Sequence, residues 1–147
     1  MTLNKRLSGL AMTTVVGAAF VASVSSTTAF AGNCQRVKPR VTNLSGKQIT
    51  VKDLIYKRTR RGDGLTHTEG LPNKALDTGD KGTWPNQRLN HLNSGHYAQF
   101  GVKFRVRRDS DNTWINLRIL KPNDEKCWDG KTVNIKIRES DIARARS

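Results

Sequence analysis

The chain has 147 residues and a formal net charge of +14 at neutral pH, because 26 lysines and arginines outnumber 12 aspartates and glutamates. That length suits one domain with a core of its own, and the charge favours four classes of anionic partner: nucleic acid, acidic polysaccharide, anionic lipid headgroups or an acidic protein. Charge alone selects none of the four, and a basic surface that only keeps the protein in solution is the competing interpretation.

The first segment has the pattern of a secretory signal peptide. Lys5 and Arg6 give a positive start, residues 10–24 are mostly apolar, and residues 29–31 form an A-x-A cleavage pattern. The apolar run is short for a membrane-spanning helix, and no second run follows it. We therefore predict a signal peptide over residues 1–31. The mature protein is then expected to be secreted or extracytoplasmic, in a periplasm, a cell wall or the medium, without a transmembrane segment.

The first half of the mature chain carries strand signals separated by turns. An early strand is expected over residues 37–42, where Pro39 confines it to the edge of a sheet or to the start of a strand. Residues 49–56 alternate apolar and polar side chains and predict a second strand. The pattern of residues 65–92 is weak, and we expect one or two short strands and much loop there.

Two short motifs lie in turns of this half. Residues 61–63 read Arg-Gly-Asp, a tripeptide that an integrin ligand presents at an exposed loop tip, but a plain hairpin turn is the favoured interpretation. Residues 43–45 read Asn-Leu-Ser and fit the N-glycosylation sequon. Neither motif assigns a function by itself.

The second half contains the clearest strands. Apolar and polar residues alternate without a break over 98–106, and again over 114–119 and 133–138. Turn signals recur between the strands along the whole mature chain, as they do in proteins built from short antiparallel strands. The sequence predicts an all-β fold, a single small antiparallel β-sandwich or open barrel over residues 32–138.

The last residues, 139–147, form a basic C-terminal tail. Ser140 could cap a short helix, and the arginines that follow would suit the end of one. Such a helix is too short to persist alone. We therefore expect a frayed tail.

The two cysteines, Cys34 and Cys127, both lie in the mature chain. A lone pair in an exported protein predicts one structural disulfide, which would enclose almost the whole domain and contribute about 4 to 5 kcal/mol to stability. The chain has no CxxC motif, and no histidine stands near either cysteine in the sequence. No metal site and no cofactor are predicted.

The strands on either side of residues 108–112 predict a hairpin with one buried (dry) face and one solvent-exposed (wet) face. Whatever the register, pairing the two dry faces also brings the two wet faces together, since side chains alternate with a period of two. The wet face then holds Tyr97, Gln99, Lys103, Arg105, Arg107, Trp114, Asn116 and Arg118. Guanidinium groups and aromatic rings suit anionic groups, stacked bases and sugar faces. The other interpretation is an ordinary wet face on which Trp114 shields apolar neighbours.

From this face the sequence predicts a secreted, non-catalytic binding protein for an anionic ligand. The predicted ligand-binding residues are Lys103, Arg105, Arg107, Trp114 and Arg118. The alternative is a small secreted hydrolase, a nuclease or a glycan-degrading enzyme, that uses His67, His91 and His96, with His67 and Glu69 or His96 as acid and base. No catalytic residue is assigned, because these histidines show no recognisable catalytic or metal-binding spacing.

Overall fold

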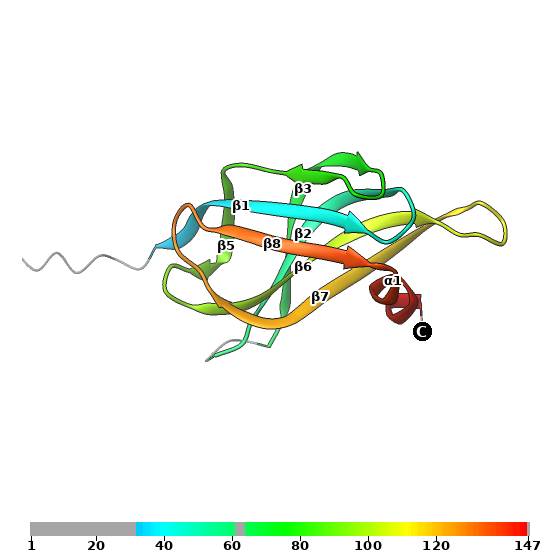
Figure 1. The fold of residues 1–147 in the computed structure, drawn as a ribbon. Helices are drawn as coiled ribbons and strands as arrows, with labels where there is room; N and C mark the ends of the chain where they lie inside the picture. Colours follow the sequence, from blue (N-terminus) through cyan, green and yellow to red (C-terminus); the bar gives the residue numbers. More distant parts are fainter. Residues whose placement is uncertain (1–31, 61–63, 147) are drawn as a thin grey trace, which may run out of the picture.

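The computed structural model describes residues 32–60 and 64–146, in which eight strands and one helix follow one another along the chain (Figure 1). The predicted signal peptide and the Arg-Gly-Asp tripeptide lie outside the described residues. The elements are β1 (Asn33–Leu44), β2 (Ile49–Arg58), β3 (Thr66–Leu76), β4 (Lys81–Thr83), β5 (Gln87–Asn93), β6 (Tyr97–Arg107), β7 (Trp114–Lys126), β8 (Thr132–Arg138) and α1 (Glu139–Arg146).

The strands form two sheets that pack face to face. One sheet has the order β3-β2-β6-β7 and is antiparallel throughout. In the other, β1 is central, with β4 and β5 antiparallel along one side and β8 along the other. This architecture confirms the predicted small all-β sandwich.

One strand pair departs from the antiparallel expectation. β1 and β8 run parallel over seven register pairs, from Lys38 opposite Thr132 to Leu44 opposite Arg138. The disulfide accounts for the direction, because Cys34 at the start of β1 is bonded to Cys127 just before β8. Both strands therefore begin at the same end of the sandwich. The whole of the domain between them serves as the long crossover that a parallel pair requires.

The core lies between the two sheets and follows the predicted alternation. In β6, Ala98, Phe100, Val102, Phe104 and Val106 are all buried, and the residues between them, apart from Gly101, are half-buried or exposed. The inward-facing residues of β1 and β8 meet them from the opposite sheet. Burial of these side chains is the main stabilising term of the fold, at about 1.5 to 3 kcal/mol for each large one.

The expectation of mostly loop over residues 65–92 is wrong, because β3, β4 and β5 occupy most of it. β3 escaped detection because it is an edge strand in which only Leu71 and Leu76 are buried. β3 is held in place by backbone hydrogen bonds to β2. Backbone pairing does not require alternating apolar side chains, so the sequence does not show it. The structure therefore has more strand there than the side chains indicate.

The expectation that Pro39 lies at an edge or at the start of a strand is also wrong, since β1 is the central strand of its sheet. The Lys38 N–H donates toward β8, to Lys131 O, so the neighbouring Pro39 nitrogen points to the opposite side by alternation. On that side β5 pairing ends at Val37 and β4 pairing begins at Arg40. Proline is tolerated because its missing N–H falls at this break.

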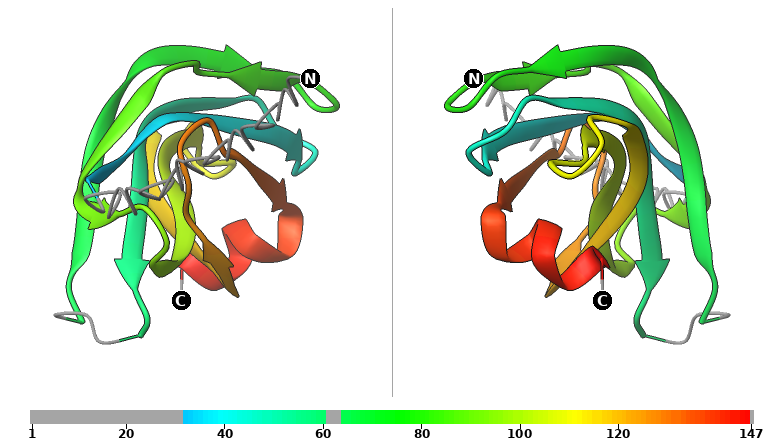
Figure 2. Two further views of the ribbon diagram at one scale, coloured as in Figure 1. Left: turned by 90° about the vertical axis from the view of Figure 1, so that its left-hand side faces the viewer. Right: turned by 90° about the vertical axis from the view of Figure 1, so that its right-hand side faces the viewer.

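The C-terminal tail is not frayed; it forms α1, which lies across the opening between β7 and β8 (Figure 2). Ile142 is buried against the core, and Arg138 N–H donates to Asp141 Oδ2 at 2.9 Å, which caps the first turn. Lys121 Nζ of β7 reaches the same oxygen at 2.7 Å. A helix of eight residues persists here because tertiary contacts hold it. Within the described ranges, no helix is long and apolar enough to cross a membrane.

Candidate functional site

The β6–β7 hairpin brings the predicted ligand-binding residues together on one outward surface. Lys103 lies opposite Arg118, Arg105 opposite Asn116, and Arg107 opposite Trp114. Lys103 and Arg105 are half-buried, and the other three predicted residues are exposed. We call the surface made by Lys103, Arg105, Arg107, Trp114 and Arg118 the β6–β7 face. Three of its cations, Lys103, Arg105 and Arg107, are every second residue of β6 and therefore follow one another along its outward side.

Trp114 holds two of the arginines in place. The guanidinium carbons of Arg105 and Arg107 lie 4.8 and 5.1 Å from the centre of the Trp114 ring system. Each such contact contributes about 0.5 to 1 kcal/mol at an exposed site. The Nε atom of Arg105 is buried and has no hydrogen-bond partner among the described residues. The tryptophan thus engages the protein's own cations, which fixes two charges side by side on a rigid strand.

A shallow hollow extends the β6–β7 face onto β2. Its lining includes Lys103, Asn116 and Arg118 of the hairpin, together with Lys52 and Asp53 of β2. A register shift between Val51 and Asp53 marks a bulge that disturbs the alternation of β2 at this point. Alternation within the hairpin does not reveal the two β2 residues, because they join the site through the pairing of β2 with β6.

Asp53 changes the electrostatics of this hollow. It lies directly opposite Lys103 across the β2–β6 pair, and Lys103 in turn lies opposite Arg118. The row therefore contains one carboxylate and two cations, so its net charge remains positive. The rows of Arg105 and Arg107 pair with Asn116 and Trp114 and carry no carboxylate on β6 or β7. Each of the three rows therefore has one net positive charge.

The turn of the hairpin carries two carboxylates with partners of their own. Asp109 pairs with Lys47, and the hydrogen bond from that lysine holds the pKa of Asp109 below its ordinary value. The hydroxyl and backbone N–H of Thr113 donate to Asp111, and these hydrogen bonds lower the pKa of its carboxyl. Both groups stay ionised at neutral pH. Each of them is ion-paired, Asp109 with Lys47 and Asp111 with Arg108, so they add no net negative charge next to the β6–β7 face.

Two of the three histidines come together at the junction of β3 and β5. The rings of His67 and His91 stack with their centres 4.4 Å apart, and Tyr56 stacks on His67 at 5.5 Å. His96 belongs to a different site, a turn in which its backbone pairs with Asn93 and Cys127. The hollow beside Lys103 and Arg118 contains no histidine.

Glu69, the carboxylate next to this histidine pair, is engaged in structural hydrogen bonds. Its Oε1 accepts from the Tyr56 hydroxyl at 2.9 Å and from Asn90 N–H at 3.0 Å. The Tyr56 hydroxyl in turn accepts from His91 N–H at 3.1 Å. This network ties β2 and β3 of one sheet to β5 of the other. The geometry gives Glu69 a role in closing the sandwich.

The remaining surface aromatic residues also carry cations. Arg60 lies 4.0 Å above the ring of Tyr97, and Lys131 lies 4.1 Å from that of Trp128. The predicted disulfide between Cys34 and Cys127 is present, and both residues are fully buried. Among residues 32–60 and 64–146, no group of three or more His, Cys, Asp or Glu side chains could hold a metal ion.

Comparisons with known proteins add no relative to this description: no family model matches the chain, and neither the curated proteins nor the solved structures contain a significant match.

Proposed function

We propose that this protein is a non-catalytic, extracytoplasmic binding protein that holds an anionic polysaccharide on the β6–β7 face. The observation that carries the proposal is the run of Lys103, Arg105 and Arg107 along one rigid strand, with Arg118 beside it and two of the guanidinium groups fixed on Trp114. Successive outward residues of a strand are about 6.6 Å apart. A linear polymer with regularly spaced negative groups can therefore contact several of these cations at once.

The surface aromatics favour a ligand recognised by charge rather than by stacking. Tyr97, Trp114 and Trp128 each have a cation of the protein over the ring. Proteins that bind single-stranded nucleic acid use free aromatic faces as stacking platforms for bases. An acidic polysaccharide needs only cations at a suitable spacing. The disulfide fits an extracytoplasmic location, where such polymers are available.

The proposal is tested by retention on immobilised heparin over a salt gradient. The Arg105→Gln/Arg107→Gln variant removes two charges, and the matched control Lys74→Gln/Lys126→Gln removes two exposed lysines outside the five residues of the β6–β7 face, one on β3 and one at the opposite end of β7. We expect steeply salt-dependent retention of the wild-type protein and a loss of at least about tenfold in affinity for the first variant, because fewer counterions are released. Equal retention of the two variants would contradict the proposal.

Duplex DNA, anionic vesicles and an acidic protein serve as competitors in the same assay. Each is attracted by a basic surface, so the class that displaces the protein at the lowest charge concentration identifies the preferred ligand. The hydrolase alternative is tested by the chain length of heparin and of DNA after prolonged incubation with the purified protein. We expect both polymers to remain intact, and shortening of either would favour an enzyme.

A further inference from the structure

The sheet that lies opposite the β6–β7 face contains cations and no acidic residue. Its four strands, β1, β4, β5 and β8, include no aspartate and no glutamate. The other sheet, by contrast, has carboxylates in β2, β3 and β7. Surfaces that only maintain solubility carry both signs of charge interspersed. The absence of acids from a whole sheet is therefore a property that a solubility role does not explain.

The register of β1 and β8 arranges these cations in order. The outward rows at positions 38, 40, 42 and 44 of β1 contain Lys38, Arg40, Lys136 opposite Thr42, and Arg138 opposite Leu44. Because the pairing runs without a register shift, each row supplies one cation of this series, and the rows are about 6.6 Å apart. We call Lys38, Arg40, Lys136 and Arg138 the cationic stripe. It passes from β1 to β8 over about 20 Å.

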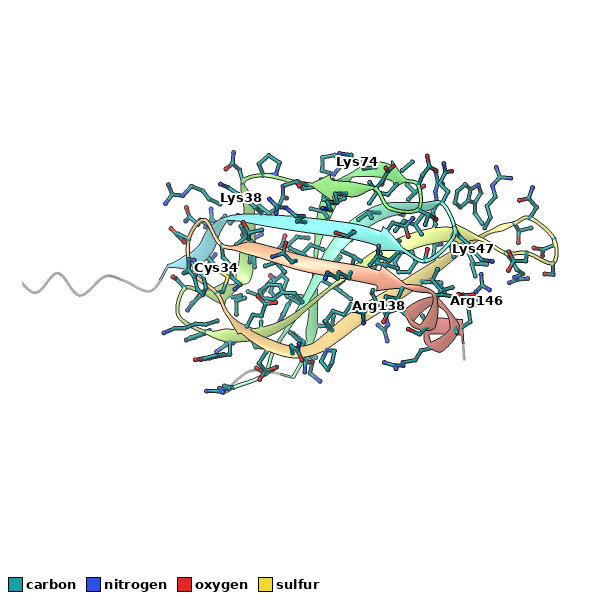
Figure 3. All side chains as sticks on the ribbon, viewed as in Figure 1. Cys34, Lys38, Lys47, Lys74, Arg138 and Arg146 are labelled. Carbon is teal, nitrogen blue, oxygen red and sulfur yellow. A yellow bond between two sulfur atoms is a disulfide. The ribbon has the colours of Figure 1, made fainter. Side chains whose placement is uncertain are left out.

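The cationic stripe is exposed and forms no ion pair in the part of the chain that the structure describes, and the carboxylate close to it is that of Asp141, beside Arg138 at its end. All four of its side chains are exposed, and Figure 3 labels Lys38 on β1 and Arg138 at the end of β8. None of the four forms an ion pair with a carboxylate of the described residues. Lys81 of β4, also exposed, lies opposite Thr42 and adds a fifth charge beside the stripe. Like charges on neighbouring strands repel one another, which a bound polyanion would relieve.

We propose that the cationic stripe is a second binding surface for an anionic polysaccharide, so that one molecule bridges two polymer chains. The inference rests on the proposed function for the nature of the ligand, and on the sandwich for the geometry. The stripe and the β6–β7 face belong to different sheets, and both face away from the core that the sheets share. One extended polymer segment cannot contact both surfaces without passing around the domain. Two segments bind without interfering.

Binding stoichiometry tests the second surface directly. A short heparin oligosaccharide is titrated into the wild-type protein and into variants that each lose two charges: Arg40→Gln/Lys136→Gln in the stripe, Arg105→Gln/Arg107→Gln in the β6–β7 face and Lys74→Gln/Lys126→Gln as control. We expect two oligosaccharides per molecule for the wild type and the control, and one for each of the other variants. Saturation at one for the wild type, with no change in the stripe variant, would overturn the proposal.

Bridging is measured by energy transfer between two pools of heparin, one labelled with a donor and one with an acceptor. The wild-type protein and the control variant should bring the pools together, and the stripe variant should bind heparin yet reduce the transfer to background. Undiminished transfer with a correctly folded stripe variant would overturn the proposal. Lys38→Gln/Arg138→Gln provides a second stripe variant if the first does not fold. Occupation of the stripe by duplex DNA or anionic vesicles, without heparin, also overturns it.

Failure of the proposed function has a different signature. If Arg105→Gln/Arg107→Gln binds and bridges as the wild type does, the β6–β7 face is not a ligand site. Loss of binding in the stripe variants would then leave the cationic stripe as the surface that holds the polysaccharide. The two conclusions are therefore separable in one set of proteins.

Discussion

Gly101 is a residue at which the backbones of β6 and β7 leave no room for a side chain. A Cβ atom at this position would overlap the carbonyl oxygen of Ile119 and lie 2.8 Å from the Cα of Leu120. Both obstacles are backbone atoms of β7, which cannot rotate away as a side chain can. The glycine therefore sets the close approach of the two strands that carry the β6–β7 face.

We predict that Gly101→Ala lowers the free energy of unfolding by about 1 to 3 kcal/mol, the usual cost of overpacking. Urea denaturation measures this value, and heparin retention should weaken in parallel because the strands are forced apart. Gly70→Ala on β3 is the matched control, since a Cβ there meets no atom within 4 Å. Its effect should stay within about 0.5 kcal/mol of zero or be slightly stabilising. Equal effects of the two substitutions would contradict the steric explanation.

At the scale of elements, α1 is held to the sandwich by one carboxylate as well as by Ile142. Burial alone would raise the pKa of Asp141, but hydrogen bonds from Lys121 Nζ and Arg138 N–H outweigh it and hold that pKa below its ordinary value. A lowered pKa in the folded state means that ionised Asp141 stabilises the fold. This contribution is present above the unfolded pKa, about 3.9, and is lost as the pH falls through the folded pKa.

We predict that Asp141→Asn is less stable than the wild type at pH 7 and that the difference disappears at acid pH. Asparagine keeps the shape of the side chain and can still accept from Arg138 N–H, so the change isolates the charge. Urea unfolding of both proteins at neutral pH and below the folded pKa gives the comparison. A difference in stability that is the same at both pH values would show that charge does not hold the helix.

The elements also show which features a sequence can predict. β6 was predictable because it has one dry and one wet face, and the alternation of its side chains records that arrangement. β3 was not, because an edge strand stabilised by backbone pairing needs few apolar residues. α1 depends on Ile142, a single buried residue, and on a lysine from a distant strand. Local patterns cannot reveal contacts of that range.

The candidate site likewise has residues that the sequence predicts and residues that it does not. The composition of the β6–β7 face followed from alternation alone, since any register that pairs the dry faces gives it. Asp53 joins the site through β2, whose place beside β6 no local pattern indicates. The cationic stripe was hidden because Lys38 and Lys136 are nearly a hundred residues apart in sequence and come onto one surface only through the parallel pairing of β1 and β8. Local turn signals predict hairpins, and a pairing between the first and last strands has none.

At the scale of the whole molecule, the Cys34–Cys127 disulfide closes the domain and fixes the parallel pair. It joins residues 93 positions apart and fully buried, at the end of the sandwich where β1 and β8 begin. In the chain-entropy model a loop of that length contributes about 4 to 5 kcal/mol. Parallel pairs also need a long crossover, and closing such a loop is costly in entropy. The disulfide lowers this entropy cost, because it already holds the two ends of the loop together in the unfolded chain.

We predict that Cys34→Ala/Cys127→Ala lowers the free energy of unfolding by about 4 kcal/mol in urea denaturation. Because the bond anchors β1 beside β8, its loss should loosen that pair sooner than the β6–β7 hairpin, which is joined by a short turn. Hydrogen exchange of the double variant should therefore show greater loss of protection in β8 than in β6. Its bridging of labelled heparin should fall further than its binding of a short oligosaccharide. Uniform loss of protection in both strands would instead mean that the disulfide stabilises the domain as a single unit, with no particular hold on the surface that carries the cationic stripe.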